Sequence, residues 1–332
     1  RKKKKQTANA NANVVFGLPE VAEVDMTYVE TATPHKTALV YDDYMKLHAN
    51  PIMLSHPESP DRIARIFQVL TTAGVAERCQ RAIVQPPSVP TLPTNKGTDE
   101  EVVPAETNNA DDDEDAKETK QDNNDGGATT STASLATDDD VLLAHTPTYL
   151  EWVHKVEAMT LDERIALAKT LNSIFLNQYS VDVARYAAAC ASRLVLDVLR
   201  GEYDNGLAIV RPPGHHVESS RCLGFGIFNN IAIAARVAQR EVPGSRVMIV
   251  DWDIHHGNGT QDIFLDDPSV LFFSVHGFLA GKYFPGGPAG SPTQVGTGSG
   301  KGFNVNVAWS DLRKDDCDYL AVFNQVRQHQ LP

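Results

Sequence analysis

The sequence predicts an α/β fold, in which helices flank a mostly parallel sheet. Two observations support this prediction. Short runs of β-branched and apolar residues alternate with longer stretches of helical periodicity, which is typical of parallel strands joined by crossover helices. Polar residues suited to a functional site follow directly after several predicted strands. Open α/β sheets bind ligands beyond the carboxyl ends of their strands, so these residues are expected to converge.

The individual elements follow from hydrophobic periodicity and from capping residues. The expected strands are residues 37–41, 207–210, 246–253, 270–276 and 303–307. The expected helices are one that begins near Ile63, then residues 148–158, 161–171, 181–200, 231–241 and 260–265, and one that begins near Asp315. Ser180 is expected to cap the start of the longest helix, and Gly201 its end. Either Asn229 or Asn230 is expected to cap the helix over 231–241.

The net charge of −13 comes from one segment rather than from the folded surface. Residues 99–140 contain 15 Asp and Glu residues and two Lys, which accounts for the whole of it. Pro, Thr, Asn, Asp, Glu, Gly and Ser dominate from 86 to 140, so this segment buries too little apolar area to order itself. We therefore predict a disordered acidic insert at 86–140. It interrupts a domain at 37–332, which follows a basic and polar N-terminal extension at 1–36.

Several features concern the location of the protein. No apolar run reaches the roughly 18–20 residues of a membrane span, and the N-terminus lacks the pattern of a signal peptide, so no membrane association is expected. The four cysteines form no CxxC pair, which favours reduced thiols in an intracellular protein. The basic run at 1–5 is either a nuclear-import signal or a solvated terminus. We expect a nuclear location, with the cytoplasm as a second one.

The stretch from Asp251 to Gly259 is the strongest candidate for a site. Asp251, Asp253 and His255 share parity, so on an extended chain they face one way. A carboxylate and an imidazole at positions 253 and 255 suit Zn²⁺ or another first-row divalent ion, with a further ligand from elsewhere. The alternative is a buried hydrogen-bonded cluster.

A pair of adjacent histidines, His215 and His216, follows a rigid Pro-Pro-Gly turn. Neighbouring imidazoles do not both charge easily, so their pKa values should diverge, giving one neutral base and one electrostatic partner. The alternatives are further zinc ligands or surface histidines. A strand-buried Asp251 needs a cation or an imidazole N–H, and Asn258 is suited to orient the other imidazole.

Three further residues allow two interpretations each. Phe225 and Phe284 lie in glycine-flanked loops, where they either line a narrow channel or pack in the ordinary way. Arg62 stands at a helix start, which the helix dipole does not favour for a cation, and spacing alone suggests an exposed side chain.

Together these motifs resemble the zinc-dependent histone deacetylases, class II. The resemblance covers roughly 37–85 and 141–332, and Trp252 and Asn258 point to class II. It implies an arginase/deacetylase-type α/β fold. The motifs that carry it are RPPGHH at 211–216, GFGIFNN at 224–230, DWDIHHGNGTQ at 251–261, FFSVH at 272–276, YFPG at 283–286 and GTGSGKGFNVNVAW at 296–309.

The resemblance implies a role for each central residue. Asp253 and His255 are expected to be two of three ligands of one catalytic Zn²⁺. His216 is expected to be the general base that activates water. His215, backed by Asp251, is expected to be its electrostatic partner. Asn258 stands where class I enzymes have an aspartate behind the second histidine.

The resemblance also implies more distant sites. Gly224, Phe225 and Phe284 would line the acyl-lysine tunnel, and Arg62 would lie beside an inner cavity, contrary to the simple expectation. One or two structural K⁺ ions are implied. The expected ligands of the first are Asp251, Ser274 and the carbonyls of Asp253, His255 and Val275, and those of the second are contributed by Phe264, Asp267 and Val270.

Two departures from the family pattern stand out. Gly226 replaces a cysteine of the usual GFC, which is expected to enlarge the inner cavity wall. The family's aspartate ligand and its Gly-Gly-Tyr motif are not reached before Pro332, so a C-terminal remainder is expected as a continuation or as a second chain. Residues 1–332 alone are expected to be inactive.

The expected function is hydrolysis of N-ε-acetyl-lysine in histones or other proteins, with release of acetate. A co-repressor complex is a candidate partner. One alternative is a catalytically weak acyl-lysine reader or co-repressor scaffold, which the residue at the family's tyrosine position would distinguish. Another is an acetylpolyamine deacetylase. A ureohydrolase would need a second set of Asp and His ligands, and the sequence shows one.

Overall fold

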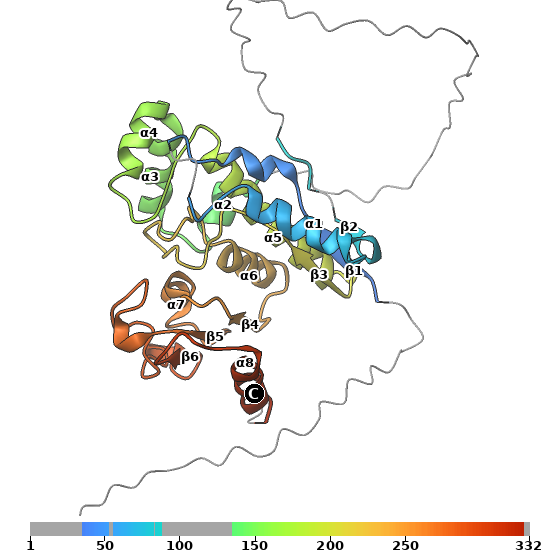
Figure 1. Ribbon diagram of the computed structural model, residues 1–332, viewed down its shortest axis with the longest axis vertical. Coiled ribbons are helices and arrows are strands. Elements are labelled where there is room, and N and C mark those ends of the chain that lie inside the picture. Colours follow the sequence, from blue (N-terminus) through green and yellow to red (C-terminus); the bar gives the residue numbers. More distant parts are fainter. Residues whose placement is uncertain (1–34, 53–55, 83, 88–134, 329–332) are drawn as a thin grey trace, which may run out of the picture. The chain divides into compact units, whose positions relative to one another are not determined.

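The strands form two parallel sheets in a computed structural model that describes residues 35–52, 56–82, 84–87 and 135–328 (Figure 1). One sheet has the order β2-β1-β3, and the other has the order β4-β5-β6. Every strand pair is parallel. The strands are β1 (Thr37–Val40), β2 (Gln80–Arg81), β3 (Asn205–Ala208), β4 (Val247–Asp251), β5 (Val270–Gly277) and β6 (Asn304–Trp309).

Helices join most of these strands, as expected for parallel pairs, whereas a loop with two 3₁₀ turns joins β5 to β6. All of the described strands and helices belong to one compact unit, Lys36–Pro332. The helices are α1 (Asp61–Thr72), α2 (Asp138–Val141), α3 (Pro147–Ala158), α4 (Leu161–Ala168), α5 (Ser180–Leu199), α6 (Asn230–Glu241), α7 (Asn258–Phe264) and α8 (Asp316–Gln328). Short 3₁₀ turns occur at Asp43–Leu47, Ala76–Arg78, Leu279–Gly281 and Gly298–Gly300. The α/β class predicted from the sequence is confirmed.

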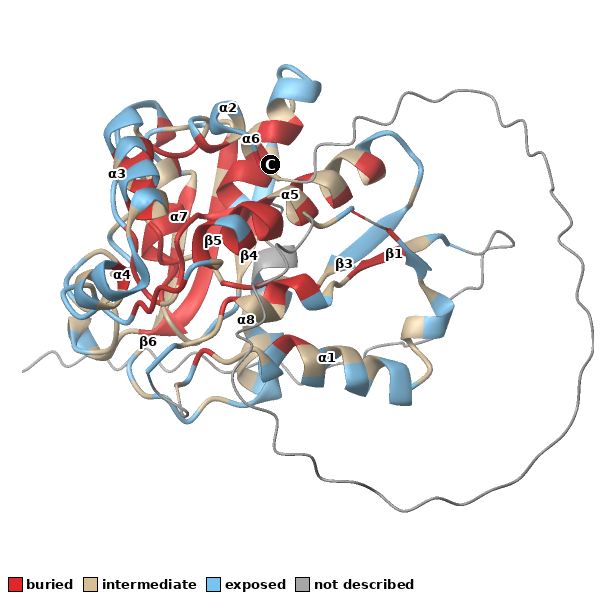
Figure 2. Ribbon diagram, turned by 90° about the horizontal axis from the view of Figure 1, so that it is seen from above, coloured by how far each residue is buried: buried red, intermediate tan, exposed pale blue. Residues whose placement is uncertain are grey.

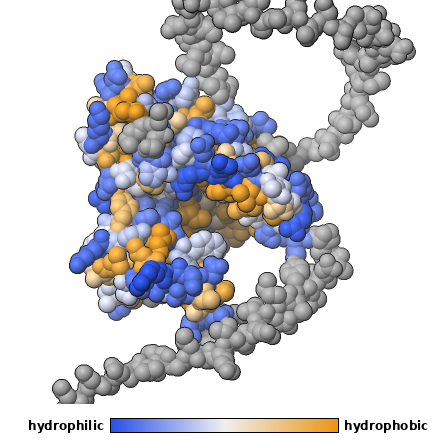
Figure 3. All heavy atoms as spheres, viewed as in Figure 1, coloured by the Kyte–Doolittle hydropathy of each residue, from blue (hydrophilic) through white to orange (hydrophobic). Residues whose placement is uncertain are grey.

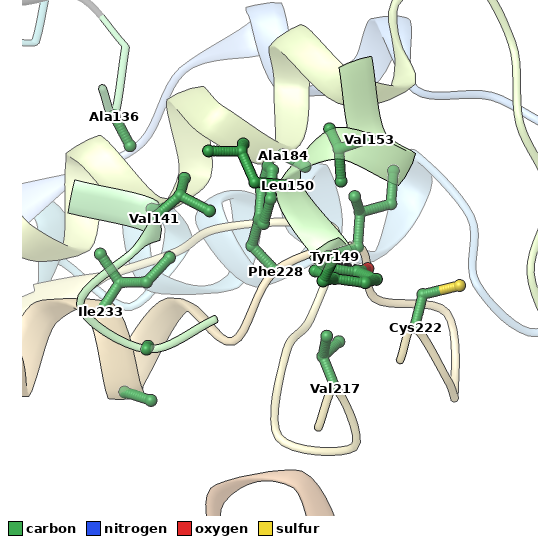
Figure 4. Packing of buried hydrophobic residues seen from close by; sticks show 14 of the residues in the cluster. Ala136, Val141, Tyr149, Leu150, Val153, Ala184, Val217, Cys222, Phe228 and Ile233 are labelled. Atoms are coloured by element: carbon green, nitrogen blue, oxygen red, sulfur yellow. Dashed lines mark hydrogen bonds between the residues drawn. The ribbon is translucent and has the colours of Figure 1, made fainter. Parts of the chain in front are cut away.

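Helix α5 contributes to two hydrophobic cores. Ala184 and Ala188 pack with the core around α3 and α6, whereas Ala187 and Cys190 pack with the core around β1. Small side chains on both faces of α5 allow both cores to pack closely against it. Helices α5 and α6 are buried along much of their length (Figure 2). The first core includes Tyr149 (Figure 4), and the hydroxyl of Tyr149 donates to the Ile227 carbonyl at 2.7 Å. Helix α5 therefore ties the β1 region to the segment that carries the site.

Apolar residues lie among polar ones on the surface (Figure 3). Leu207 on β3 and Met248 on β4 are exposed, and both strands are edges of their sheets. Trp252, just after β4, is also exposed. No helix in the described ranges is long and apolar enough to cross a membrane.

The predicted C-terminal boundary of the disordered insert, residue 140, is too late. Ala136 is buried in the first core, and Thr137 caps α2 with a reciprocal bond to Asp140. The acidic composition of this segment suggested disorder. Aspartates are nevertheless favourable in the first turn of a helix, which is where they lie in α2. The disorder predicted for 88–134 lies outside the described residues, as do most of the N-terminal extension and the basic run at 1–5.

Two local predictions also differ from the structure, and a third, which allowed either of two residues, is confirmed for one of them. The strand expected at 207–210 is β3, two residues earlier and largely exposed, because it forms a sheet edge. Ser180 is the first residue of α5 and does not cap it, since its buried hydroxyl accepts from the backbone of Asn177 at 2.7 Å instead. Asn229, rather than Asn230, caps α6.

Candidate functional site

Two loops bring the predicted catalytic side chains together, one after β3 and one after β4. The backbone N–H groups of Gly259 and Thr260, in the first turn of α7, donate to the carbonyl of His215 at 2.9 and 3.2 Å. The loop after β4 is thereby fixed against the histidine pair. This is the convergence that the sequence predicts for residues beyond the strand ends.

His215 is paired with a carboxylate. Its Nδ1 lies 2.9 Å from Oδ2 of Asp251, the last residue of β4. Burial lowers the pKa of His215, but the hydrogen bond and the charge of Asp251 outweigh burial, so the pKa is raised overall. Gly257 makes room for this pair, because a Cβ there would lie 2.2 Å from Asp251 Oδ2. His215 is therefore disposed to carry positive charge.

His216 is paired with a neutral amide. Its Nδ1 lies 2.8 Å from Oδ1 of Asn258, and its ring centroid lies 4.0 Å from that of His215. Burial, followed by the charge of His215, lowers the pKa of His216 to about 3. The pKa values of the two histidines diverge, as expected from their adjacency. His216 is therefore neutral at pH 7, which a general base requires.

Asp253 and His255 lie beyond the strand. Strand β4 ends at Asp251, so the parity argument does not apply to these two residues, and a bend brings them together instead. His255 Nδ1 lies 3.0 Å from Asp253 Oδ1, and the His255 backbone N–H donates to the same oxygen. Burial raises the pKa of Asp253, but the hydrogen bond from His255 and the charge of His215 hold it well below its usual range. Asp253 is therefore ionised at neutral pH.

This pair fits part of a zinc site. An ionised carboxylate oxygen and an imidazole nitrogen, both partly exposed, converge on one point, and these are donor types that Zn²⁺ prefers. The described residues contain no group of three or more His, Cys, Asp or Glu side chains that could hold a metal. A zinc ion held by this pair would need a third protein ligand besides these two.

Aromatic residues flank His216 and His255. The Phe284 ring lies edge-on to His216, with centroids 4.9 Å apart. Gly224 (φ 57°) passes so close that a Cβ there would lie 2.3 Å from His216 Cδ2, and the half-buried Phe225 follows it. Sequence reasoning overlooked Tyr283, which stacks on His255 at 5.0 Å, although it stands beside Phe284 in the YFPG motif.

The inner-cavity role expected for Arg62 stays a prediction. Its side chain is exposed in the first turn of α1, as spacing alone suggested. The expectation for Gly226 is wrong. A Cβ at that position would lie 2.3 Å from the Pro213 carbonyl oxygen and 2.6 Å from Val217 Cγ2. The missing side chain therefore allows close packing of two loops and does not enlarge a cavity.

A buried ion pair between Arg211 and Glu58 also escaped sequence reasoning. The side chains of Glu58 and Arg211 are 0% and 2% exposed, and their bidentate contacts measure 2.8 and 2.5 Å. Arg211 also donates to the Met45 carbonyl at 2.6 Å. This pair fixes the start of the His215–His216 loop. The signal in the sequence was an arginine directly before the Pro-Pro-Gly turn, because an arginine that is buried there needs an anionic partner.

The residues predicted to bind K⁺ have mixed surroundings. Ser274 lies in register with Asp251 across β4 and β5, and its hydroxyl is 2.8 Å from His276 Nδ1. Val275, Phe264 and Val270 are buried. The Asp267 carboxylate is bonded to Arg236 and to Ser269, so it is already engaged. Both K⁺ sites stay predictions.

Comparison with known proteins assigns the chain to a family. Residues 112–331 match the histone deacetylase domain. The chain belongs to the histone deacetylase family. This membership confirms the resemblance and implies a zinc cofactor.

Individual relatives agree with this assignment. The chain is 37% identical to histone deacetylase 5 of Arabidopsis thaliana over 88% of this chain and 37% of the relative. It is 42% identical to polyamine deacetylase HDAC10 of Danio rerio over 87% of this chain and 36% of the relative. A crystal structure of the HDA15 HD domain aligns with a TM-score of 0.67 and 31% identity, over 88% of this chain and 68% of that one. The chain thus spans about a third of the length of these curated relatives.

Proposed function

We propose that the protein is a zinc-dependent hydrolase that removes the acetyl group from N-ε-acetyl-lysine in histones or other proteins and releases acetate. The observation that carries this proposal is the pair of histidines with different partners. His215 is paired with the carboxylate of Asp251, and His216 with the amide of Asn258, beside the converging Asp253 and His255. The proposal includes class II membership, which the neutral Asn258 supports.

Asp253 and His255 would hold one zinc ion, with a ligand from outside the described residues completing the set. Bound zinc supplies Lewis-acid chemistry, polarising the acetyl carbonyl and lowering the pKa of water. We also propose one or two structural K⁺ ions. The register of Asp251 with Ser274 supports the first of these sites.

The protein's own residues would divide the remaining work. His216 is neutral, and its Nδ1 is occupied by Asn258, so Nε2 is available to take a proton from the attacking water. His215, held towards its charged form by Asp251, would stabilise negative charge that develops on the substrate. Phe225 and Phe284 would flank the acyl-lysine chain and exclude water, which strengthens both electrostatic effects.

An acetylpolyamine is the second candidate substrate. The chain is 42–44% identical to proteins named polyamine deacetylase HDAC10 from Danio rerio and Rattus norvegicus. A catalytically weak acyl-lysine reader or co-repressor scaffold is the third candidate. For the cellular role we propose chromatin and transcription regulation in the nucleus, with the cytoplasm as a second location and a co-repressor complex as partner. The basic run at 1–5 supports nuclear import.

The test uses the full-length protein with an acetylated histone peptide and, separately, an acetylated polyamine. We expect zinc-dependent release of acetate from the peptide, and a decrease in kcat of about 10²–10⁴-fold in His216→Ala. Asp253→Asn should lose bound zinc. His154→Ala, which replaces a partly exposed histidine on α3, is the matched control and should retain activity. Preference for the polyamine would favour the second candidate, and binding of the peptide without hydrolysis the third.

A further inference from the structure

We infer that Glu218 is a positioning residue that sets the orientation of the Asn258 amide and thereby decides which ring nitrogen of His216 carries the proton. The assignment rests on the proposed function only in treating His216 as the base. Glu218 lies two residues after His216, outside the predicted site, and acts on the imidazole through the intervening amide.

The contacts form a continuous chain. Glu218 Oε1 accepts a hydrogen bond from Asn258 Nδ2 at 2.9 Å. Asn258 Oδ1 lies 2.8 Å from His216 Nδ1. The same Nδ2 group has a second and longer contact, at 3.4 Å, with the His216 carbonyl. Asn258 is buried, so water does not readily replace these partners.

The direction of the amide follows from the donors and acceptors available. An asparagine side chain can be turned so that its oxygen and its NH₂ group exchange places, and its neighbours select between the two orientations. A carboxylate only accepts hydrogen bonds. In the turned orientation, the Asn258 oxygen would face the Glu218 oxygen, and two acceptors would meet in a partly buried setting. Glu218 therefore holds the NH₂ group towards itself and the oxygen towards His216.

The tautomer of His216 follows from this orientation. Because Asn258 Oδ1 is an acceptor, the facing Nδ1 has to carry the hydrogen. The lone pair is then on Nε2, the nitrogen that a general base uses here. A carboxylate behind His216 would impose the same tautomer by itself, because it presents no donor. An amide does not, so an asparagine at this position needs a third residue to fix its direction.

Glu218 is itself held in place. Its backbone forms an antiparallel bridge with Arg221, and Arg221 Nη2 donates to Glu218 Oε1 at 2.6 Å. The next residue, Ser219, bonds through its backbone N–H and its hydroxyl to Asp262 on α7. The turn that carries Glu218 is therefore fastened to the helix that carries Asn258, which suits a positioning role.

The experiment reads the tautomer directly, without zinc or activity. Residues 1–332 are labelled with ¹⁵N-histidine, and long-range ¹H–¹⁵N correlation spectra are recorded at neutral pH in a chelator. Loss of one ring system in His216→Gln assigns His216. We expect a protonated Nδ1 and an unprotonated Nε2 in the wild type. Glu218→Gln should keep this pattern, because Arg221, which only donates hydrogen bonds, contacts the same position and so holds the glutamine oxygen towards Asn258.

Two variants and one rescue test the inference. Glu218→Ala removes the acceptor and should give a mixture of tautomers. Glu218→Lys presents only donors, so it should turn the amide and move the proton to Nε2. Adding Asn258→Asp to Glu218→Lys should restore the Nδ1–H form, because the aspartate accepts from both neighbours. Glu202→Lys makes the same charge change on an exposed residue and should leave His216 unchanged.

The outcomes separate cleanly. An Nε2–H form in the wild type, or an unchanged tautomer in both Glu218→Ala and Glu218→Lys, overturns the inference. Circular dichroism checks that each variant folds. If Glu218→Lys does not fold, the His216 tautomers of Glu218→Ala and Glu218→Gln are compared instead, and they should differ. In the full-length protein, kcat should fall in Glu218→Lys and recover in the double variant. A wild type without deacetylase activity would refute the proposed function while the tautomer measurements still judge Glu218.

Discussion

Glu58→Gln removes one charge of the buried ion pair that anchors the His215–His216 loop. The Arg211 guanidinium would keep its bond to the Met45 carbonyl but would lose its anionic partner, and both side chains are almost fully shielded from solvent. Removing one partner of a buried pair typically costs about 3–5 kcal/mol, because a charge stays buried without compensation. That is a large fraction of the roughly 5–15 kcal/mol that stabilises a typical native protein.

Thermal unfolding followed by circular dichroism measures this cost. A loss of 1 kcal/mol lowers Tm by about 2–4 °C in a domain of about 150–250 residues, so Glu58→Gln should lower Tm by about 6–20 °C. Glu241→Gln is the matched control, since it neutralises a carboxylate 2.7 Å from Arg200 on the surface. Exposed pairs contribute about 0–1 kcal/mol, so Tm should change little.

The comparison of the two variants decides whether burial controls the cost. Equal changes in Tm for Glu58→Gln and Glu241→Gln would refute the reasoning. A second check replaces both buried partners, by Glu58→Leu with Arg211→Met. This double variant leaves no unpaired charge, so it should cost less than Glu58→Gln alone.

Two further predictions concern the histidine pair. Gly224→Ala places a Cβ 2.3 Å from His216 Cδ2, so by urea unfolding it should cost more than the roughly 1–2 kcal/mol of left-handed strain, and kcat should fall. Gly201→Ala, with φ 74° and nothing within 4 Å of the added Cβ, should cost the strain alone, and equal losses would contradict the proposed clash. The raised pKa of His215 contributes stability that is complete below about pH 6.5 and is lost as pH rises through the folded-state pKa. In metal-free protein between about pH 5 and 9, Asp251→Asn should therefore be most destabilising on the acid side, and a pH-independent difference in urea unfolding would argue against the link.

The sequence determined the local parts of this protein. Apolar periodicity predicted most helices and strands to within a few residues, since the pattern records which face is buried. The adjacency of His215 and His216 after the Pro-Pro-Gly turn predicted diverging pKa values, because two neighbouring imidazoles repel each other's charge. The residues of DWDIHH indicated a carboxylate and an imidazole that converge, although the argument from strand parity was wrong beyond Asp251.

Tertiary structure decided the features that depend on contacts between distant segments. Arg62 is exposed at the start of α1, and Gly226 allows two loops to approach closely where the family resemblance suggested an enlarged cavity wall. Glu218 reaches Asn258 across 40 positions, and Glu58 reaches Arg211 across 153. No periodicity links such positions, because a pattern along the chain reports only the burial of each residue's own face. Which charge or amide meets another in the interior is fixed only when the strands and loops have packed together.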